Sequence, residues 1–138
     1  MVGGPVGNHV VRYYEQSGLS PLCYRSFSDD TGQPAQCWEL PCGSGLCLQE
    51  TTVSPSDVGV SQDLFVVEFF EDAFLGVRVA IMYGYSQAGT LAAGYYFSTK
   101  ICPSLAAYLG QWYVFRWADA NGNGYPDASD TFSLVARG

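Results

Sequence analysis

Charged side chains are scarce in this chain of 138 residues, making up only 14% of it. There is one lysine, Lys100, and thirteen acidic residues against six basic ones give a net charge of −7. Nucleic acids and anionic membrane surfaces are bound through basic patches, so this composition argues against both as partners. So few charges are also unusual on the surface of a freely soluble monomer. The composition therefore favours a surface that neighbouring subunits partly cover.

Long hydrophobic runs are missing too. No stretch of roughly eighteen apolar residues occurs, so we expect no membrane span. The first residues, Met1 to Gly7, have neither the basic end nor the apolar centre of a signal peptide. The chain also lacks an Asn-x-Ser/Thr acceptor for a glycan. Both a mature secreted chain and a native start at Met1 remain open.

Apolar residues are abundant at 48%, and aromatic residues reach 15%, which is enough to bury the core of one domain. No long 3.6-residue period appears, whereas short alternating segments lie between turn signals. We therefore predict an all-β fold, an antiparallel β-sandwich or barrel, with one strand covered on both faces. The predicted strands are 9–16, 22–27, 64–70 (the strand covered on both faces), 77–83, 95–101, 111–117 and 131–137, with a helical turn at 104–109.

The most specific pattern is a twelve-residue segment between the last two predicted strands, residues 119–130. Side chains with oxygen occupy positions one, three, five, nine and twelve, and a glycine occupies position six. This is the spacing of a calcium loop, in which carboxylate and carbonyl oxygens surround one hard cation. Two Asn-Gly turns within a hairpin are the alternative interpretation. The predicted ligands are Asp119, Asn121, Asn123, Tyr125 (through its backbone oxygen), Asp127 and Asp130.

This loop resembles the EF-hand and dockerin-type calcium loops of secreted bacterial β-domains. The resemblance covers about a tenth of the chain and implies calcium as the bound ion. Two residues differ from the EF-hand pattern. Asp130 stands where a longer glutamate usually chelates with both oxygens, and Pro126 has no N–H to pair with a second loop. We therefore expect a single, weak structural site suited to about millimolar calcium outside the cell.

Five cysteines are many for a small intracellular domain. Three of them follow the spacing Cys37-x4-Cys42-x4-Cys47, and the others are Cys23 and Cys102. This pattern predicts a loop closed by disulfides and leaves one thiol over, either buried or bonded to another chain, while the pairing stays open. A zinc site would require Cys-x2-Cys pairs or more histidines than His9 alone. Disulfides and calcium together predict an extracellular or cell-surface location.

One segment resembles a catalytic motif. Gly84-Tyr85-Ser86-Gln87-Ala88 is similar to the nucleophile elbow of cutinases and other α/β-hydrolases, with alanine in place of the last glycine. That fold supplies a histidine after the serine, whereas His9 precedes it. Paired carboxylates of a glycosidase are not evident either, and Glu68 is expected to be solvated or at an interface. We therefore predict no enzymatic activity.

The N-terminal residues suggest how copies of this chain could assemble with one another. We divide the sequence into an N-terminal arm, residues 1–18, and a calcium-stabilised domain, residues 19–138. Within the arm, residues 8–16 read as a strand, with Val10 to Glu15 at its centre and Ser17-Gly18 as a hinge. The arm weakly resembles donor strands of pilus and fibre subunits. This resemblance implies a structural subunit that polymerises into an extracellular, helical filament when residues 8–16 complete the sheet of a neighbour.

An ordinary first strand within its own sheet is the alternative interpretation of residues 8–16. A second function, that of a calcium-stabilised carbohydrate-binding module, is also consistent with the composition, because aromatic side chains can stack on sugar rings. The candidate aromatic residues are Trp38, Trp112, Trp117, Tyr95 and Tyr96, although a core position is expected for each in so aromatic a domain.

Overall fold

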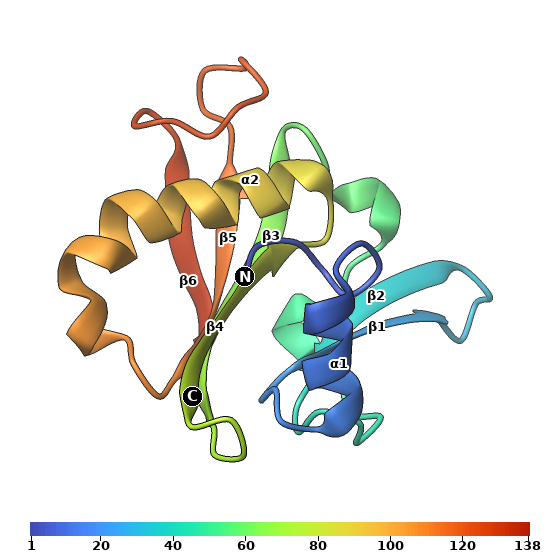
Figure 1. Ribbon diagram of the computed structural model, residues 1–138. Helices are drawn as coiled ribbons and strands as arrows, with labels where there is room; N and C mark the ends of the chain where they lie inside the picture. The colour runs from blue at the N-terminus through green and yellow to red at the C-terminus, as the bar shows by residue number, and fades with distance from the viewer.

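The computed structural model describes residues 1–138 and contains a four-stranded antiparallel sheet with strand order β4-β3-β5-β6 (Figure 1). A separate two-stranded antiparallel sheet pairs β1 with β2. The prediction of antiparallel strands is confirmed, and the 119–130 loop does join the last two of them. The strands are β1 (Cys23–Ser28), β2 (Pro34–Glu39), β3 (Gln62–Asp72), β4 (Val77–Gly84), β5 (Trp112–Ala118) and β6 (Thr131–Arg137).

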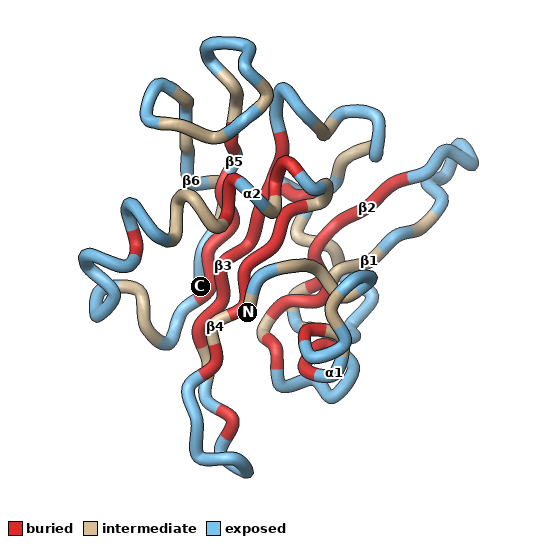
Figure 2. Tube along the Cα trace, turned by 45° about the horizontal axis from the view of Figure 1, so that its top comes forward, coloured by how far each residue is buried: buried red, intermediate tan, exposed pale blue.

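Strand β3 is the centre of the fold and is buried on both faces, as its apolar sequence predicts. Side chains such as Phe65 and Val67 point to one face, which helix α2 (Gln87–Tyr96) covers. Leu64 and Val66 point to the other face, where they pack with α1, β1 and β2. The molecule therefore has three layers, with the large sheet in the middle (Figures 1 and 2).

The predicted strand 9–16 is wrong, because this segment forms helix α1 (His9–Ser17). The Asn8 side chain accepts hydrogen bonds from the first free N–H groups, and Gly18 ends the helix with a φ of 72°. The alternation of a nine-residue segment is a weak signal, whereas a cap at each end of it favours a helix. Gly18, interpreted above as a hinge residue, is the C-terminal cap.

Helix α1 buries one face against its own sheet. Val11, Tyr14 and Glu15 lie three and four positions apart and are all buried. The Tyr14 hydroxyl donates a hydrogen bond to Asp72 of β3, and Glu15 accepts one from the hydroxyl of Tyr83 in β4 at 2.5 Å. The arm therefore shares a core with the rest of the chain.

Two further segments differ from the prediction. Residues 95–101, predicted as a strand, continue α2 through a π-helical turn, η3 (Phe97–Ile101). Strand β2 lies in the region expected to be a cysteine-rich loop. The short helices are η1 (Gln49–Thr51), η2 (Pro55–Asp57) and η4 (Cys102–Ala107), and the last of these confirms the predicted helical turn. No helix is long and apolar enough to cross a membrane.

Two disulfides hold the β1–β2 layer. Cys23 pairs with Cys42, and Cys37 pairs with Cys47, while Cys102 is a free, exposed thiol. Both bonds lie within residues 23–47, so this layer is cross-linked where it has only two strands and little regular structure. The prediction of a disulfide-closed loop with one thiol left over is confirmed. The bonds indicate an oxidising environment.

Glu68 is fully buried in β3, which corrects the expectation of a solvated or interface carboxylate. Its side chain does point away from Phe65 and Val67, but α1 and the β1–β2 layer cover that face too. Burial raises its pKa to about 8, although hydrogen bonds from Leu22 N–H and the Ser20 hydroxyl to Oε2 act in the opposite direction. The other oxygen, Oε1, has no hydrogen-bond partner.

We expect Glu68→Gln to remove a pH dependence of stability. The folded chain keeps a proton that the unfolded chain releases between the ordinary pKa of 4.5 and about 8. The free energy of unfolding of the wild type therefore falls as the pH rises through this window. Glutamine cannot ionise, so urea unfolding near pH 8.5 should show a gain on the order of 3 kcal/mol relative to wild type, and little gain near pH 4.

Glu71→Gln is the matched control, because Glu71 lies on the same strand and is exposed. It should leave the pH profile unchanged. Parallel profiles of the wild type and Glu68→Gln would contradict the burial of an ionisable Glu68.

Candidate metal centre

The 119–130 loop is fixed at both ends by the sheet. At its start, the Asp119 N–H donates to the carbonyl of Ser61, just before β3, at 2.9 Å. At its end, the Asp130 carboxylate accepts a hydrogen bond from the indole N–H of Trp117, also at 2.9 Å. Trp117 is a fully buried residue of β5, so it ties the last predicted ligand to the core. The loop itself projects from one end of the sheet (Figure 1).

Asp119 organises the first half of the loop. Its Oδ1 accepts from the N–H groups of Asn121 and Gly122, and its Oδ2 accepts from Gly124 N–H at 2.7 Å. This arrangement requires φ values of 73° and 77° at Gly122 and Gly124, a region where glycine is favoured. The glycine at position six of the motif thus has the conformational role that the sequence pattern predicts.

Asp127 accepts hydrogen bonds from the side chains of both asparagines in the loop. Its Oδ2 accepts from the amides of Asn121 at 2.8 Å and Asn123 at 2.7 Å, and its Oδ1 accepts from the Ser129 hydroxyl at 2.6 Å. Hydrogen bonds from Ser129, and then from Asn121, lower the pKa of Asp127 to about 2. Asp127 is therefore a charged acceptor at neutral pH.

The last predicted ligands take different positions. Asp130 reaches back to accept from the N–H groups of Ala120 and Asp127, so it closes the loop. The backbone N–H of Tyr125 donates to Asn123, while the Tyr125 side chain is exposed. Direct contacts thus join Asn121, Asn123 and Asp127, whereas Asp119 and Asp130 join the network through backbone groups.

The loop fits calcium by its chemistry, through three carboxylates and two carboxamides within twelve residues. The amide nitrogens of Asn121 and Asn123 point at Asp127, while their oxygens accept hydrogen bonds from the N–H groups of Asn123 and Tyr125. Nowhere in the chain do three or more carboxylate, histidine or cysteine side chains converge on one point. Any cation bound here would therefore draw on carbonyl oxygens as well as carboxylates.

A cavity of about 300 Å³, with both polar and apolar lining residues, lies beside this loop. Asp127 and Asp130 line it on one side, and Tyr95 and Thr99 line it on the other. The rings of Tyr95 and Phe132 stack there with centroids 5.8 Å apart. The three tryptophans that were candidate sugar platforms, Trp38, Trp112 and Trp117, are all buried in the core, whereas Tyr95 and Tyr96 are half-buried.

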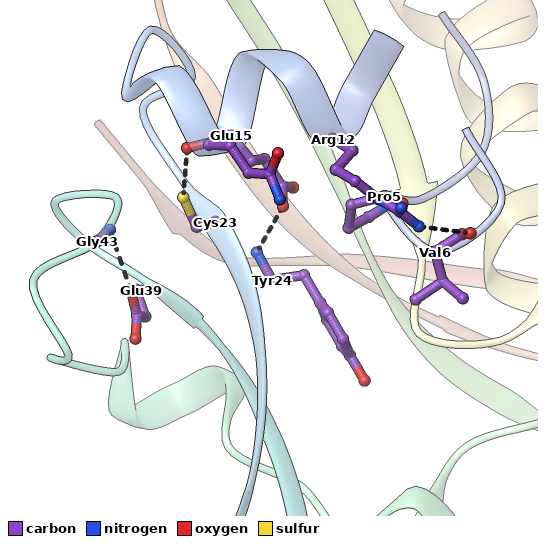
Figure 3. A pocket seen from close by; sticks show the side chains of 9 residues that line it. Pro5, Val6, Arg12, Glu15, Cys23, Tyr24, Glu39 and Gly43 are labelled. Atoms are coloured by element: carbon purple, nitrogen blue, oxygen red, sulfur yellow. Dashed lines mark hydrogen bonds between the residues drawn. The ribbon is translucent and has the colours of Figure 1, made fainter. Parts of the chain in front are cut away.

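A second cavity, of about 440 Å³, lies between α1 and the β1–β2 layer, and Glu15 and Glu39 line it (Figure 3). Burial raises the pKa of Glu15 to about 7, despite the opposing hydrogen bonds from Tyr83 and Tyr24. The Tyr83 hydroxyl in turn accepts from the Trp38 indole. Sequence reasoning missed this buried network, because only a helical period places Glu15 on the face toward the sheet.

The elbow-like segment forms a strand, a turn and a helix, with Ser86 at the N-terminus of α2. The Ser86 hydroxyl donates to the buried carboxylate of Asp63 at 2.5 Å, and its oxygen accepts from Ala88 N–H and Gly89 N–H. Asp63 also accepts from the N–H groups of Ser86 and Gly89. These contacts make Ser86 the N-terminal cap of α2. His9 lies on α1, which covers the opposite face of the sheet.

Comparisons with protein-family models, with curated proteins and with solved structures find no match for this chain.

We expect calcium to raise the melting temperature of the wild-type chain by about 5 °C or more at saturation. In Asp119→Asn this rise should be lost, because the first predicted ligand loses its charge. Differential scanning calorimetry with calcium and with a chelator measures both states.

Asp29→Asn is the matched control. Asp29 also caps a turn, by accepting from Thr31 and Gln33, but it lies between β1 and β2. The calcium-dependent rise should persist in this variant. An equal rise in Asp119→Asn and in the wild type would contradict the assignment of Asp119 as a ligand.

Proposed function

We propose that this protein is a non-enzymatic structural subunit that assembles with copies of itself outside the cell, with calcium stabilising the 119–130 loop. The observation that carries this proposal is the amount of apolar surface on a chain with few charges. Large apolar side chains are exposed in several parts of the fold, among them Val6, Val10, Phe74, Leu75 and Leu134. Single exposed apolar side chains are normal, but Phe74 and Leu75 are neighbours in one turn, and adjacent exposed apolar side chains are typical of a surface that a partner covers.

The two disulfides and the 119–130 loop support the proposed location outside the cell. Two disulfides are stable in an oxidising compartment, and a solitary loop of this kind suits about millimolar calcium. Such a cation would offset two of the three negative charges that Asp119, Asp127 and Asp130 place within one short loop. Calcium would then act on stability rather than on chemistry.

The mode of assembly follows from the sheet edges. Donor-strand exchange through residues 8–16 would require α1 to give up its contacts with Asp72 and Tyr83 and to refold as a strand. Strand β6 pairs with β5 on one side, and its other side is an edge of the sheet. Addition of a strand from another copy along β6 would extend the sheet without any refolding. We therefore favour β6 as the surface that grows the assembly.

Electron microscopy and sedimentation of the purified chain in about millimolar calcium test this proposal. We expect regular assemblies from the wild type. Leu134→Lys should disperse them, because a lysine on an edge strand opposes pairing. Leu46→Lys is the matched control, since Leu46 is an exposed leucine in the loop after β2, and it should assemble like the wild type.

Dispersed wild-type monomers at high concentration in calcium would contradict the proposal. Deletion of residues 1–18 is a poor test, because it removes the core residues Val11 and Tyr14.

Carbohydrate binding is the second candidate, favoured by the cavity where Tyr95 and Phe132 lie beside Asp127 and Asp130. Glycan-array binding that requires calcium and is lost in Tyr95→Ala would support this function.

A further inference from the structure

Three acidic side chains are buried between the N-terminal helix and the large sheet. Glu15 of α1 is 8% exposed, Asp72 of β3 is 2% exposed, and Glu68 of β3 is fully buried. None of the basic side chains of the chain is buried. A buried carboxylate without a buried cation keeps its charge only at a large cost in free energy. The contacts of this layer therefore depend on the protonation of its carboxyl groups.

Two of these acids join α1 to the sheet. The Tyr14 hydroxyl donates to Asp72 at 3.2 Å, and the Tyr83 hydroxyl of β4 donates to Glu15 at 2.5 Å. Residues 9–22, which comprise α1 and the segment after it, are called the N-terminal cover below. Both contacts hold its helix on the apolar face of the sheet.

The third acid holds the segment after α1. The Ser20 hydroxyl and the Leu22 N–H both donate to Oε2 of Glu68, at 3.0 and 2.9 Å. The second oxygen, Oε1, is buried without a hydrogen-bond partner. A proton on Glu68 keeps this oxygen pair neutral, whereas an ionised Glu68 leaves charge on an unbonded, buried oxygen.

Glu15 and Glu68 also act on each other. Burial raises the pKa of Glu15 to about 7 and that of Glu68 to about 8, and the charge of Glu15 contributes to the rise at Glu68. Glu15 lines the cavity of about 440 Å³ between α1 and the β1–β2 layer (Figure 3). Water can therefore exchange protons with this carboxyl group while the chain stays folded.

The cover is bounded by a fixed point on each side. Before it, Val2 forms a bridge with Met82 of β4. After it, Cys23 is bonded to Cys42. Within the core cluster on this face, the cover contributes only Val11, Tyr14 and Leu22. The cover can therefore separate from the sheet as one local unit while both fixed points and the β1–β2 layer stay in place.

We propose that residues 9–22 form a pH-dependent cover, which lies on the apolar face of the sheet in acidic solution and separates from it in mildly alkaline solution, when Glu15 and Glu68 lose their protons. Two like charges then face one buried site and repel each other. Separation gives both carboxylates access to water. It also exposes the apolar side chains of the sheet that the cover protects, among them Leu64, Val66 and Ile81.

The other charged groups nearby do not replace the missing cation. Arg25 of β1 is paired with Glu39 of β2 at 3.5 Å, and Arg12 of α1 donates to the carbonyls of residues 5 and 6. Strand β5 contributes only Trp112 and Val114 to this face. The remaining titratable groups around the site are Tyr14, Tyr24, Asp72, Tyr83, Tyr85 and the amino group of Met1, which donates to the carbonyl of Ala80.

Hydrogen exchange of the wild type, followed by mass spectrometry at about pH 5.5 and about pH 8.5, is the first test. The closed cover keeps protons that the separated cover releases between the ordinary pKa of 4.5 and about 8, so the free energy of separation falls as the pH rises. After correction for the intrinsic exchange rate, protection of residues 9–22 should fall about a hundredfold or more. Helix α2 should stay better protected than the cover at both values, because it packs on the other face.

Glu68→Gln tests the cause. This variant cannot ionise, so its cover should separate about tenfold less than that of the wild type near pH 8.5. Glu15→Gln is a second, independent variant and should act in the same direction. Glu71→Gln, on the same strand as Glu68 but exposed, is the matched control and should exchange like the wild type.

Equal protection of the cover at both pH values would overturn the inference. So would joint loss of protection in the cover and in α2, which indicates global unfolding, or a pH response that both glutamine variants retain. The inference goes beyond the proposed assembly and does not rest on it, since the exchange is measured in chelator at low concentration. Regular assemblies with an unresponsive cover would leave the proposed function standing alone, and a responsive cover on dispersed monomers would leave only the cover.

Discussion

The fold depends on the burial of both faces of β3. A strand with neighbours on both sides and layers on both faces has almost no access to water, so it must be filled with apolar side chains that fit two different cores. Phe65 and Val67 pack under α2, and Leu64 and Val66 pack under the α1 layer. Each remaining element then has its position set by the face of β3 that it covers.

The burial of both faces of β3 also explains how polar groups are accommodated in the core. Glu68 breaks the apolar pattern of β3 and is accommodated only because Ser20 and Leu22 supply hydrogen bonds from the segment after α1. Glu15 reaches the same layer from the helix and meets the hydroxyl of Tyr83. Buried carboxyl groups of this kind are costly unless they stay protonated or bonded. They tie the helix to one register on the sheet, because a shift would leave them without partners.

Much of the sheet could be predicted from the sequence, since alternation and turn residues mark β3, β4, β5 and β6. The helices could not be predicted in the same way. The residues that cap them are local signals, and they compete with an alternation of apolar residues that favours a strand. Asn8 and Gly18 cap α1, but its alternating apolar residues favoured a strand over so short a segment. Helix α2 is rich in small residues and lacks a clear polar face, since it lies against the sheet between half-buried neighbours.

The candidate site, too, could be predicted from the sequence only in part. Local spacing was sufficient to predict a glycine-containing loop between the last two strands, because the residues that shape it lie within twelve positions, whereas calcium binding by Asp119, Asn121, Asn123 and Asp127 stays a prediction. Local spacing could not reveal that Trp117 bonds Asp130, or that Glu15 lies in a cavity lined by β1 and β2. Those contacts depend on how distant elements pack, which a single sequence does not encode in any short pattern.

The 119–130 loop and the turn between β3 and β4 lie at opposite ends of β3, whose eleven residues span roughly 35 Å. Sites so far apart, with no shared partners, contribute to stability almost additively. Calcium would therefore strengthen one end of the molecule without tuning contacts at the other. The stability of each end of the molecule can therefore change independently of the other.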